Sequence, residues 1–365
     1  MRMIVVVGAR PNFVKVGPLV PRLVQAGHDV DIAFTGSRAA TRAEERGGTL
    51  SFHGVEVQAP RWFLDVGEDT DAVETGRALI ALEQLMRDER PDAVMAVGDV
   101  NATLAAALAA AKLGVPVIHL EAGLRCGDLS CPGEINRVLI TRVSALHLAP
   151  SENAVVNLLG EGVPEDRIQF VGSATAESVL RHADEIRKSA PCRAYDLAPG
   201  EYVLASFHRP ENLSVPAHVK GITDALCSVG LPVLVPDARD LCDASAVCAI
   251  PPAALPRCLG PVPYREMLAL QRDAAVVVTD SGGVQEEACM LGTSCVTVRE
   301  HTEHVATIEV GANRLVPAVA PMIVSAVLEA RASKRVWVAP KRWDRAVSDR
   351  IVRALKRGVA PLGQV

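Results

Sequence analysis

The stretch AVMAVGDVNATLAAALAAAKLGVPVIHLEAGLR, residues 93–125, contains the structural unit that repeats along this chain. A Val-rich run at 93–97 ends in the polar loop 98–100, an alanine-rich helical pattern follows at 101–113, and a second apolar run occupies 115–120. Apolar runs of strand length that alternate with helical patterns are typical of parallel sheets covered by helices on both faces. The stretch therefore predicts a strand–helix–strand unit of an α/β fold.

The same alternation extends from this unit toward both ends of the chain. Further strands are expected at 3–7, 29–34, 145–148, 202–206, 233–235, 275–279 and 295–298. Further helices are expected at 14–25, 71–88, 134–143, 152–159, 176–187, 219–229, 264–271, 284–291, 321–332 and 344–357. Thr70 and Ser151 are predicted N-caps, and Gly27 and Gly114 are predicted to follow helix ends. The two series predict an α/β protein with two Rossmann-like domains, whose parallel sheets face a central cleft.

Breaks in the pattern predict the domain boundaries. We expect an N-terminal Rossmann-like domain at 1–172, a hinge at 173–200, a C-terminal Rossmann-like domain at 201–342 and a closing C-terminal helix at 343–365. A length of 365 residues fits two domains, because a domain typically takes about 150 residues.

Charge, hydropathy and cysteine content exclude several classes of protein. The 38 Lys and Arg residues against 43 Asp and Glu residues give a net charge of −5, whereas a nucleic-acid partner requires a basic surface. No apolar run approaches the roughly 18 residues of a membrane span. The nine cysteines are scattered and form no C-x-x-C pair, which predicts no zinc site and a reducing, cytoplasmic location.

Ligands of open parallel sheets bind beyond the carboxyl ends of the strands, so the loops there are the candidate site. Arg10 and Lys15 follow the first strand and would clamp an anion at a helix N-terminus, or else lie solvated on a surface turn. Asp99 and Glu121 follow neighbouring strands, where partial burial suits carboxyl groups for acid/base chemistry. The alternative is that Asp99 caps a helix and Glu121 pairs with Arg125.

The second half carries the strongest local signal, TDSGGVQEE at 279–287. Ser281, Gly282, Gly283 and the N–H groups of a beginning helix predict a phosphate cradle, and Glu287 is placed to accept from ribose hydroxyls. A plain tight turn is the alternative. The loop at 8–15 is neither a dinucleotide-binding nor a nucleoside-triphosphate fingerprint, so no cofactor is predicted.

Taken in order, these loops and their neighbours resemble the non-hydrolysing UDP-N-acetylglucosamine 2-epimerases, a family with the GT-B arrangement of two Rossmann-like domains. The resemblance is carried by Gly8-Ala9-Arg10-Pro11 with Lys15, Gly98-Asp99, His119 to Arg125, Gly127-Asp128-Leu129, Glu134-Ile135-Asn136-Arg137, His208-Arg209, Asp280 to Glu287, and Arg299 with Thr302-Glu303. The family implies elimination of UDP to a glycal, followed by re-addition with C2 inverted. It also implies a phosphorylated sugar substrate and a homodimer, without a metal.

The resemblance also implies roles for single residues. The catalytic candidates are Asp99, Glu121, His208 and Glu134, and the substrate-binding candidates are Arg10, Lys15, Arg125, Arg209, Ser281, Gly282, Gly283, Glu287, Arg299 and His304.

This chain departs from the family at several of these places. Gly133 stands where the family has the first Glu of Pro-Glu-Glu, and Glu134 substitutes only if the helix shifts. The other departures are Ser37-Arg38, Pro210, Ala238, Val262, Met267 and His304-Val305. We therefore expect a sugar epimerase with an altered substrate. The alternatives are a ketose-phosphate 3-epimerase that acts by enolisation, for example on fructose 6-phosphate, a GT-B glycosyltransferase, and an inactive sugar-phosphate sensor.

Overall fold

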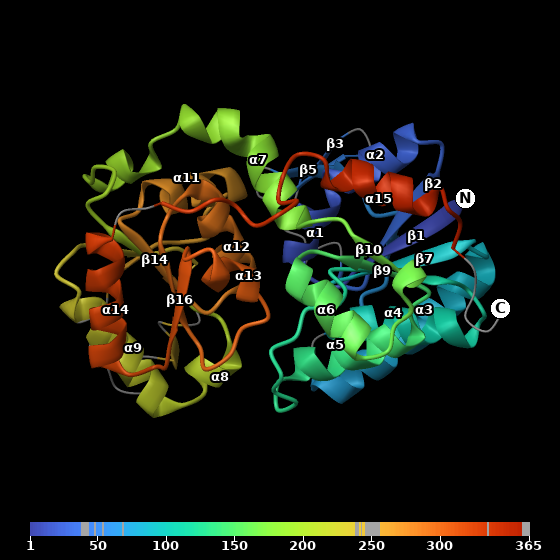
Figure 1. Cartoon of the computed structure of the whole chain (residues 1–365), viewed down its shortest axis with the longest axis horizontal. Coiled ribbons are helices and arrows are strands. Elements are labelled where there is room, and N and C mark those ends of the chain that lie inside the picture. The colour runs from blue at the N-terminus through green and yellow to red at the C-terminus, as the bar shows by residue number, and fades with distance from the viewer. Residues whose placement is uncertain are drawn as a thin grey trace. The chain divides into compact units, whose positions relative to one another are not determined.

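The computed structural model describes residues 1–37, 44–46, 49–52, 55–67, 69–237, 241, 243–244, 256–333 and 336–359 (Figure 1). The chain divides into two compact units. Unit 1 comprises Met1–Ser178 and Lys341–Val365, and unit 2 comprises Val179–Pro340. The helix α7, Ala174–Arg187, begins in unit 1 and ends in unit 2.

Unit 1 is built on a seven-stranded parallel sheet with the order β10-β9-β8-β7-β1-β2-β6. Its strands are β1 (Arg2–Val7), β2 (Asp29–Phe34), β6 (Trp62–Phe63), β7 (Ala93–Val97), β8 (Val117–Leu120), β9 (Leu146–Ala149) and β10 (Ile168–Phe170). Its helices are α1 (Arg10–Val16), α2 (Leu19–Gln25), α3 (Asp71–Glu89), α4 (Asn101–Lys112), α5 (Pro132–Val143), α6 (Glu152–Gly160), α15 (Val347–Leu355) and the short 3₁₀ helix η2 (Glu165–Arg167).

The alanine-rich helix α4 lies between α3 and α5 on one face of this sheet (Figure 1). Its short side chains Ala105, Ala106 and Ala109 are buried in the same cluster as Ile4 and Val94 of the sheet. Small side chains let the helix approach both the sheet and its neighbours closely, and so place the loop before α4 against the sheet edge.

Unit 2 is built on a six-stranded parallel sheet with the order β13-β12-β11-β14-β15-β16. Its strands are β11 (Val203–Ser206), β12 (Val233–Val235), β13 (Arg257–Cys258), β14 (Val276–Thr279), β15 (Cys295–Val298) and β16 (Asn313–Val316). Its helices are α8 (Pro210–Leu213), α9 (Pro216–Ser228), α11 (Tyr264–Asp273), α12 (Gly282–Leu291), α13 (Val305–Glu309), α14 (Ala320–Ala332) and the 3₁₀ helix η3 (Pro191–Tyr195).

Alternate residues of each strand in unit 2 face opposite helix layers, as the two-residue repeat of a strand requires. Val203 and Ala205 of β11 share a buried cluster with α9 and α14, whereas Leu204 shares one with α11 and α12. Two covered faces explain why these strands are apolar without interruption.

The structure confirms the predicted α/β class with two parallel sheets and corrects the expected helix at 14–25. That helix is two helices, α1 and α2, which are separated at Gly17 and Pro18, because proline cannot donate to the preceding turn. Ser151 caps α6 by accepting from the backbone N–H of Ala154, whereas Thr70 occupies the N-cap of α3 without a side-chain hydrogen bond.

A three-stranded antiparallel sheet was not expected from the sequence. It consists of β3 (Glu44–Arg46), β4 (Thr49–Phe52) and β5 (Val55–Gln58).

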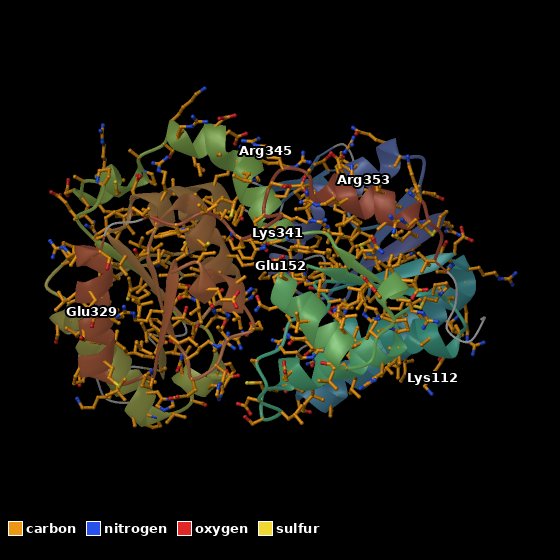
Figure 2. The ribbon with its side chains drawn as sticks, in the orientation of Figure 1. Lys112, Glu152, Glu329, Lys341, Arg345 and Arg353 are labelled. Carbon is orange, nitrogen blue, oxygen red and sulfur yellow. The ribbon has the colours of Figure 1, made fainter. Side chains whose placement is uncertain are left out.

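The C-terminal segment returns to unit 1. The ring N–H of Trp343 donates to the carbonyl of Pro150 at 2.9 Å, and Lys341 lies beside Glu152 (Figure 2) with 2.6 Å between Nζ and Oε1. Within the described ranges, no helix is long and apolar enough to span a bilayer.

Candidate functional site

The loops after β1, β7 and β8 carry the unit 1 candidates, and these three strands are neighbours in the sheet. Parallel neighbours end at the same edge, so residues 8–15, 98–101 and 121–125 meet there. Arg10 is the first residue of α1, but its side chain lies outside the described part of the chain, as do the departures Arg38 and Ala238.

A buried ion pair joins the first and third of these loops. The Lys15 ammonium donates to Oε2 of Glu121 at 2.6 Å, and the two side chains are 17% and 7% exposed. Burial raises the pKa of the Glu121 carboxyl, and the Lys15 charge opposes part of that rise. A carboxyl group whose pKa lies above its ordinary value exchanges protons more readily near neutral pH.

Glu121 also has a left-handed backbone, with φ of +71°. This conformation is costly for a residue with a side chain, and such strain is concentrated at functional sites. It turns the chain sharply at the end of β8, where the carboxylate lies beside the second loop. A Cβ atom built on Gly98 would lie 3.5 Å from Oε2 of Glu121 and 3.7 Å from Nζ of Lys15. Asp99, the next residue, therefore neighbours this pair.

Asp99 is held by Arg137 of α5. Nη2 and Nε of Arg137 lie 2.7 and 2.8 Å from Oδ2 of Asp99, and the Asn136 amide donates to the Asp99 carbonyl at 2.9 Å. Arg137 is 4% exposed while Asp99 is 36% exposed. Arg137 therefore orients the Asp99 carboxylate from the buried side, and part of the carboxylate is exposed to solvent. Asp99 is not a helix cap, because Val100 is the N-cap of α4.

Glu134 is buried, and its carboxylate holds the backbone of the loop that follows Arg125. It accepts from the backbone N–H groups of Cys126 and Gly127 at 3.1 and 2.9 Å, and it also binds Arg137. Gly133 is the residue of this helix that lies directly beside Asp99, because a Cβ atom built on it would lie 3.3 Å from Oδ2 of Asp99. Glu134 therefore does not lie where a side chain at Gly133 would.

Arg125 points away from the carboxylate pair. Its guanidinium binds both carboxylate oxygens of Glu161 at 2.7 and 2.9 Å and also donates to Thr141. The alternative in which Glu121 pairs with Arg125 is therefore wrong, since Lys15 is the partner of Glu121.

In unit 2 the candidates follow β11, β14 and β15, which are also neighbours. The fully buried Asp280 accepts from the backbone N–H groups of His208 and Arg209 and from the Asn212 amide, each at 3.1 Å. This carboxylate ties the loop after β11 to the loop after β14. The His208 ring is 53% exposed, with Nδ1 at 3.4 Å from Oδ1 of Asp280.

The expected cradle is the N-terminus of α12, with Ser281 as its N-cap. The Ser281 hydroxyl makes no capping bond, so it remains available to a ligand together with the first-turn N–H groups. A Cβ atom built on Gly282 would lie 2.6 Å from Nε2 of His304, whereas one on Gly283 would meet nothing within 4 Å. A side chain at 282 would therefore displace the His304 ring, which lies against this helix end.

Glu303 gathers three of the predicted binding residues around this helix end. Its Oε1 lies 3.3 Å from Nη2 of Arg209 and 3.7 Å from Nε2 of His304, and its Oε2 lies 2.8 Å from Nη2 of Arg299. Nδ1 of His304 lies 3.8 Å from Oε1 of Glu286. The cluster is largely buried, so the charge interactions within it are only weakly screened by water.

Glu287 lies one turn into α12 and is 7% exposed. It accepts from the Gln271 side-chain amide of α11 at 2.6 Å, which fixes the direction of its carboxylate.

Sequence reasoning missed several residues that orient the candidates: Asn136, Arg137, Gln271 and Glu303. Asn136, Arg137 and Glu303 stand in motifs that carry the family resemblance, so those motifs were usable signals. Gln271 has no local signal, because it comes from a different helix, 16 residues before its partner.

A surface hollow of about 550 Å³ lies elsewhere in unit 2 and contains none of the predicted site residues. It is lined by Glu185, Ile186, Ser189, Pro191, Pro263, Arg265 and Glu266.

The chain is similar to known proteins over nearly its whole length. Residues 25–356 match a family model described as UDP-N-acetylglucosamine 2-epimerase. The UDP-N-acetylglucosamine 2-epimerase of Methanocaldococcus jannaschii is 32% identical over an alignment of 378 positions, gaps included. The alignment covers 98% of this chain and 100% of that protein. A UDP-2,3-diacetamido-2,3-dideoxy-D-glucuronate 2-epimerase of Pseudomonas aeruginosa is 34% identical over 333 residues, which cover 89% of this chain and 90% of that protein.

The crystal structure of the M. jannaschii enzyme in complex with UDP-GlcNAc and UDP has a TM-score of 0.89 to this chain, with 98% of this chain and 100% of that chain covered at 32% identity. At this coverage the match extends through both units. The chain therefore belongs to the UDP-N-acetylglucosamine 2-epimerase family, and it is an epimerase.

Proposed function

We propose that this protein inverts C2 of a UDP-linked N-acetylated amino sugar by elimination and re-addition of UDP. The observation that carries the proposal is the placement of Asp99 beside the Lys15–Glu121 pair at one sheet edge. Two oriented carboxylates are what the removal and return of a carbon-bound proton require.

Unit 2 would hold the diphosphate. The N-terminus of α12, the Ser281 hydroxyl and the cations Arg209 and Arg299 stabilise the negative charge that develops on UDP as it leaves C1. Glu287, oriented by Gln271, would accept from the ribose hydroxyls.

Unit 1 would move the proton. The C1–O bond breaks as one carboxylate takes the C2 proton, which yields the glycal and free UDP. Re-addition of UDP at C1 then accompanies protonation of C2 from the opposite face. The product has the composition of the substrate, so no oxidant or reductant is consumed. Asp99 and Glu121 are the two groups placed for these transfers, with His208 as a third candidate.

The departures from the family favour an altered sugar. Gly133 leaves the space beside Asp99 without a side chain, and the P. aeruginosa relative is named for a diacetamido glucuronate. We propose that the sugar carries a substituent different from those of N-acetylglucosamine. A homodimer and a cytoplasmic location remain predictions.

Proton NMR in D2O tests the proposal with three compounds: UDP-N-acetylglucosamine, the UDP-diacetamido glucuronate and fructose 6-phosphate. We expect deuterium at C2 of at least one nucleotide sugar, together with its epimer. Exchange only at C3 of fructose 6-phosphate would replace the proposal with direct enolisation of a ketose phosphate. No exchange in any of them would favour a transferase or a sensor instead.

A further inference from the structure

His119 of β8 is a fully buried polar residue that the proposed mechanism does not use. Its Nε2 lies 2.8 Å from the carbonyl oxygen of Gly98, the residue before Asp99. Glu121 follows this strand directly, two residues after His119. His119 therefore connects the strand that leads into Glu121 to the loop that carries Asp99.

The direction of this hydrogen bond follows from the protonation state. Burial lowers the pKa of His119 to about 4, so the ring is neutral near neutral pH. A carbonyl oxygen only accepts, so Nε2 carries the hydrogen and donates. Nδ1 has no hydrogen-bond partner among the described residues, and in this tautomer it holds a lone pair rather than an unsatisfied N–H group.

Gly98 is attached to β8 through both of its backbone groups. Its N–H donates to the Leu120 carbonyl at 3.1 Å, and its carbonyl accepts from His119. With φ of +74°, Gly98 turns the chain at a position that glycine adopts readily. The peptide plane between Gly98 and Asp99 is thus oriented by the His119 ring.

We infer that His119 is a positioning residue that holds the peptide before Asp99 against β8 and so sets the placement of Asp99 relative to Glu121. This inference rests on the proposed function, because it assigns the two carboxylates to one reaction. A misplacement of reacting groups by about 1 Å lowers a rate by as much as 10²-fold.

The chain contains a matched control for the burial of a histidine. His147 of β9 is the ladder partner of His119 and is 1% exposed. Burial lowers its pKa to about 3, and its ring hydrogen-bonds with the backbone of Ser144, which is not a predicted site residue. Loss of the His147 ring should disturb packing beside His119 while leaving the hydrogen bond between His119 and Gly98 in place.

The experiment measures solvent deuterium exchange at C2 of the nucleotide sugar on which the parent is active. It compares the full chain with four variants: His119→Gln, His119→Asn, His119→Leu and His147→Leu. The Gln amide nitrogen reaches the position of Nε2, whereas the Asn amide is too short. We expect kcat to fall by about 10- to 100-fold in the Asn and Leu variants, with KM changed by less than about 3-fold. The Gln variant should retain most of the activity. His147→Leu should lose comparable stability in urea while keeping its kcat.

Equal losses of kcat in His119→Gln and His119→Asn, or a loss in His147→Leu as large as in His119→Leu, would overturn the inference. The Gln and Asn variants decide the question if a Leu variant does not fold. If the parent exchanges deuterium and every His119 variant is fully active, the positioning role is contradicted and the proposed function stands. A parent without exchange on any nucleotide sugar removes the proposed function, and this inference with it.

Discussion

At the scale of the residue, Glu121 combines burial, a left-handed backbone and an ion pair with Lys15. Burial suits this carboxyl group for proton transfer but makes its charged form costly in the folded state. Its raised pKa means that the folded state disfavours the ionised carboxylate relative to the unfolded chain. The free energy of unfolding therefore falls as pH rises from the ordinary value of 4.5 through the raised value. Glu121→Gln removes this dependence. We expect turnover of Glu121→Gln to fall by roughly 10²- to 10⁴-fold, and its urea midpoint to change less than that of the parent as the pH rises from 4.5 to 7.

A suitable control is Glu83→Gln, which alters an exposed carboxylate on α3 that pairs with Arg87. Turnover and stability should both stay close to those of the parent, because exposed pairs contribute little. Normal turnover in Glu121→Gln would show that this carboxylate takes no part in the reaction.

At the scale of the element, the proposed diphosphate site at the N-terminus of α12 depends on the absence of a side chain at Gly282. A Cβ atom there would lie 2.6 Å from Nε2 of His304 and 3.1 Å from Oε1 of Glu303, so Gly282→Ala must displace the His304 ring. We expect the affinity for UDP, measured by calorimetric titration, to fall by about 10-fold or more, the size of one charge-assisted hydrogen bond.

Gly76→Ala on α3 provides the comparison, since a Cβ atom there meets nothing within 4 Å. It should leave UDP affinity unchanged and stabilise the chain by about 0.5–1 kcal/mol. Parent-like affinity in Gly282→Ala would argue that the diphosphate does not bind at this helix end.

At the scale of the whole molecule, the C-terminal segment joins the N-terminal part of the chain through α15. The buried carboxylate of Glu177 accepts from the backbone N–H and the hydroxyl of Ser348, both at 2.7 Å. It thereby satisfies donors in the first turn of α15. Glu177→Ala should lower the free energy of unfolding in urea by about 1–3 kcal/mol, because buried donors lose their acceptor. Lys341→Ala breaks only the exposed pair with Glu152 and should cost less than about 1 kcal/mol. Equal losses in the two variants would contradict this account.

Much of the fold could be predicted from the sequence because it depends on local pattern. The strands at 29–34, 93–97, 233–235 and 295–298 have the predicted bounds, since uninterrupted apolar runs that end in polar loops leave little ambiguity. The helix break at Gly17 and Pro18 was also readable in principle. The antiparallel strands β3 to β5 were missed because they are only three or four residues long, and the polar–apolar alternation of TLSF in β4 and VEVQ in β5 is too brief to stand out.

The sequence by itself determined the α/β class, the candidate loops after the strands and the glycine at position 133, whereas the tertiary structure showed that this glycine lies beside Asp99. Only the tertiary structure decided which charges meet. Lys15 and Glu121 are separated by 106 residues, and Arg209 and Glu303 by 94. Such pairs depend on strand order, which places distant loops at one edge of a sheet, and no local pattern encodes that order. For the same reason the partner of Glu121 is Lys15, far along the chain, and not the nearby Arg125.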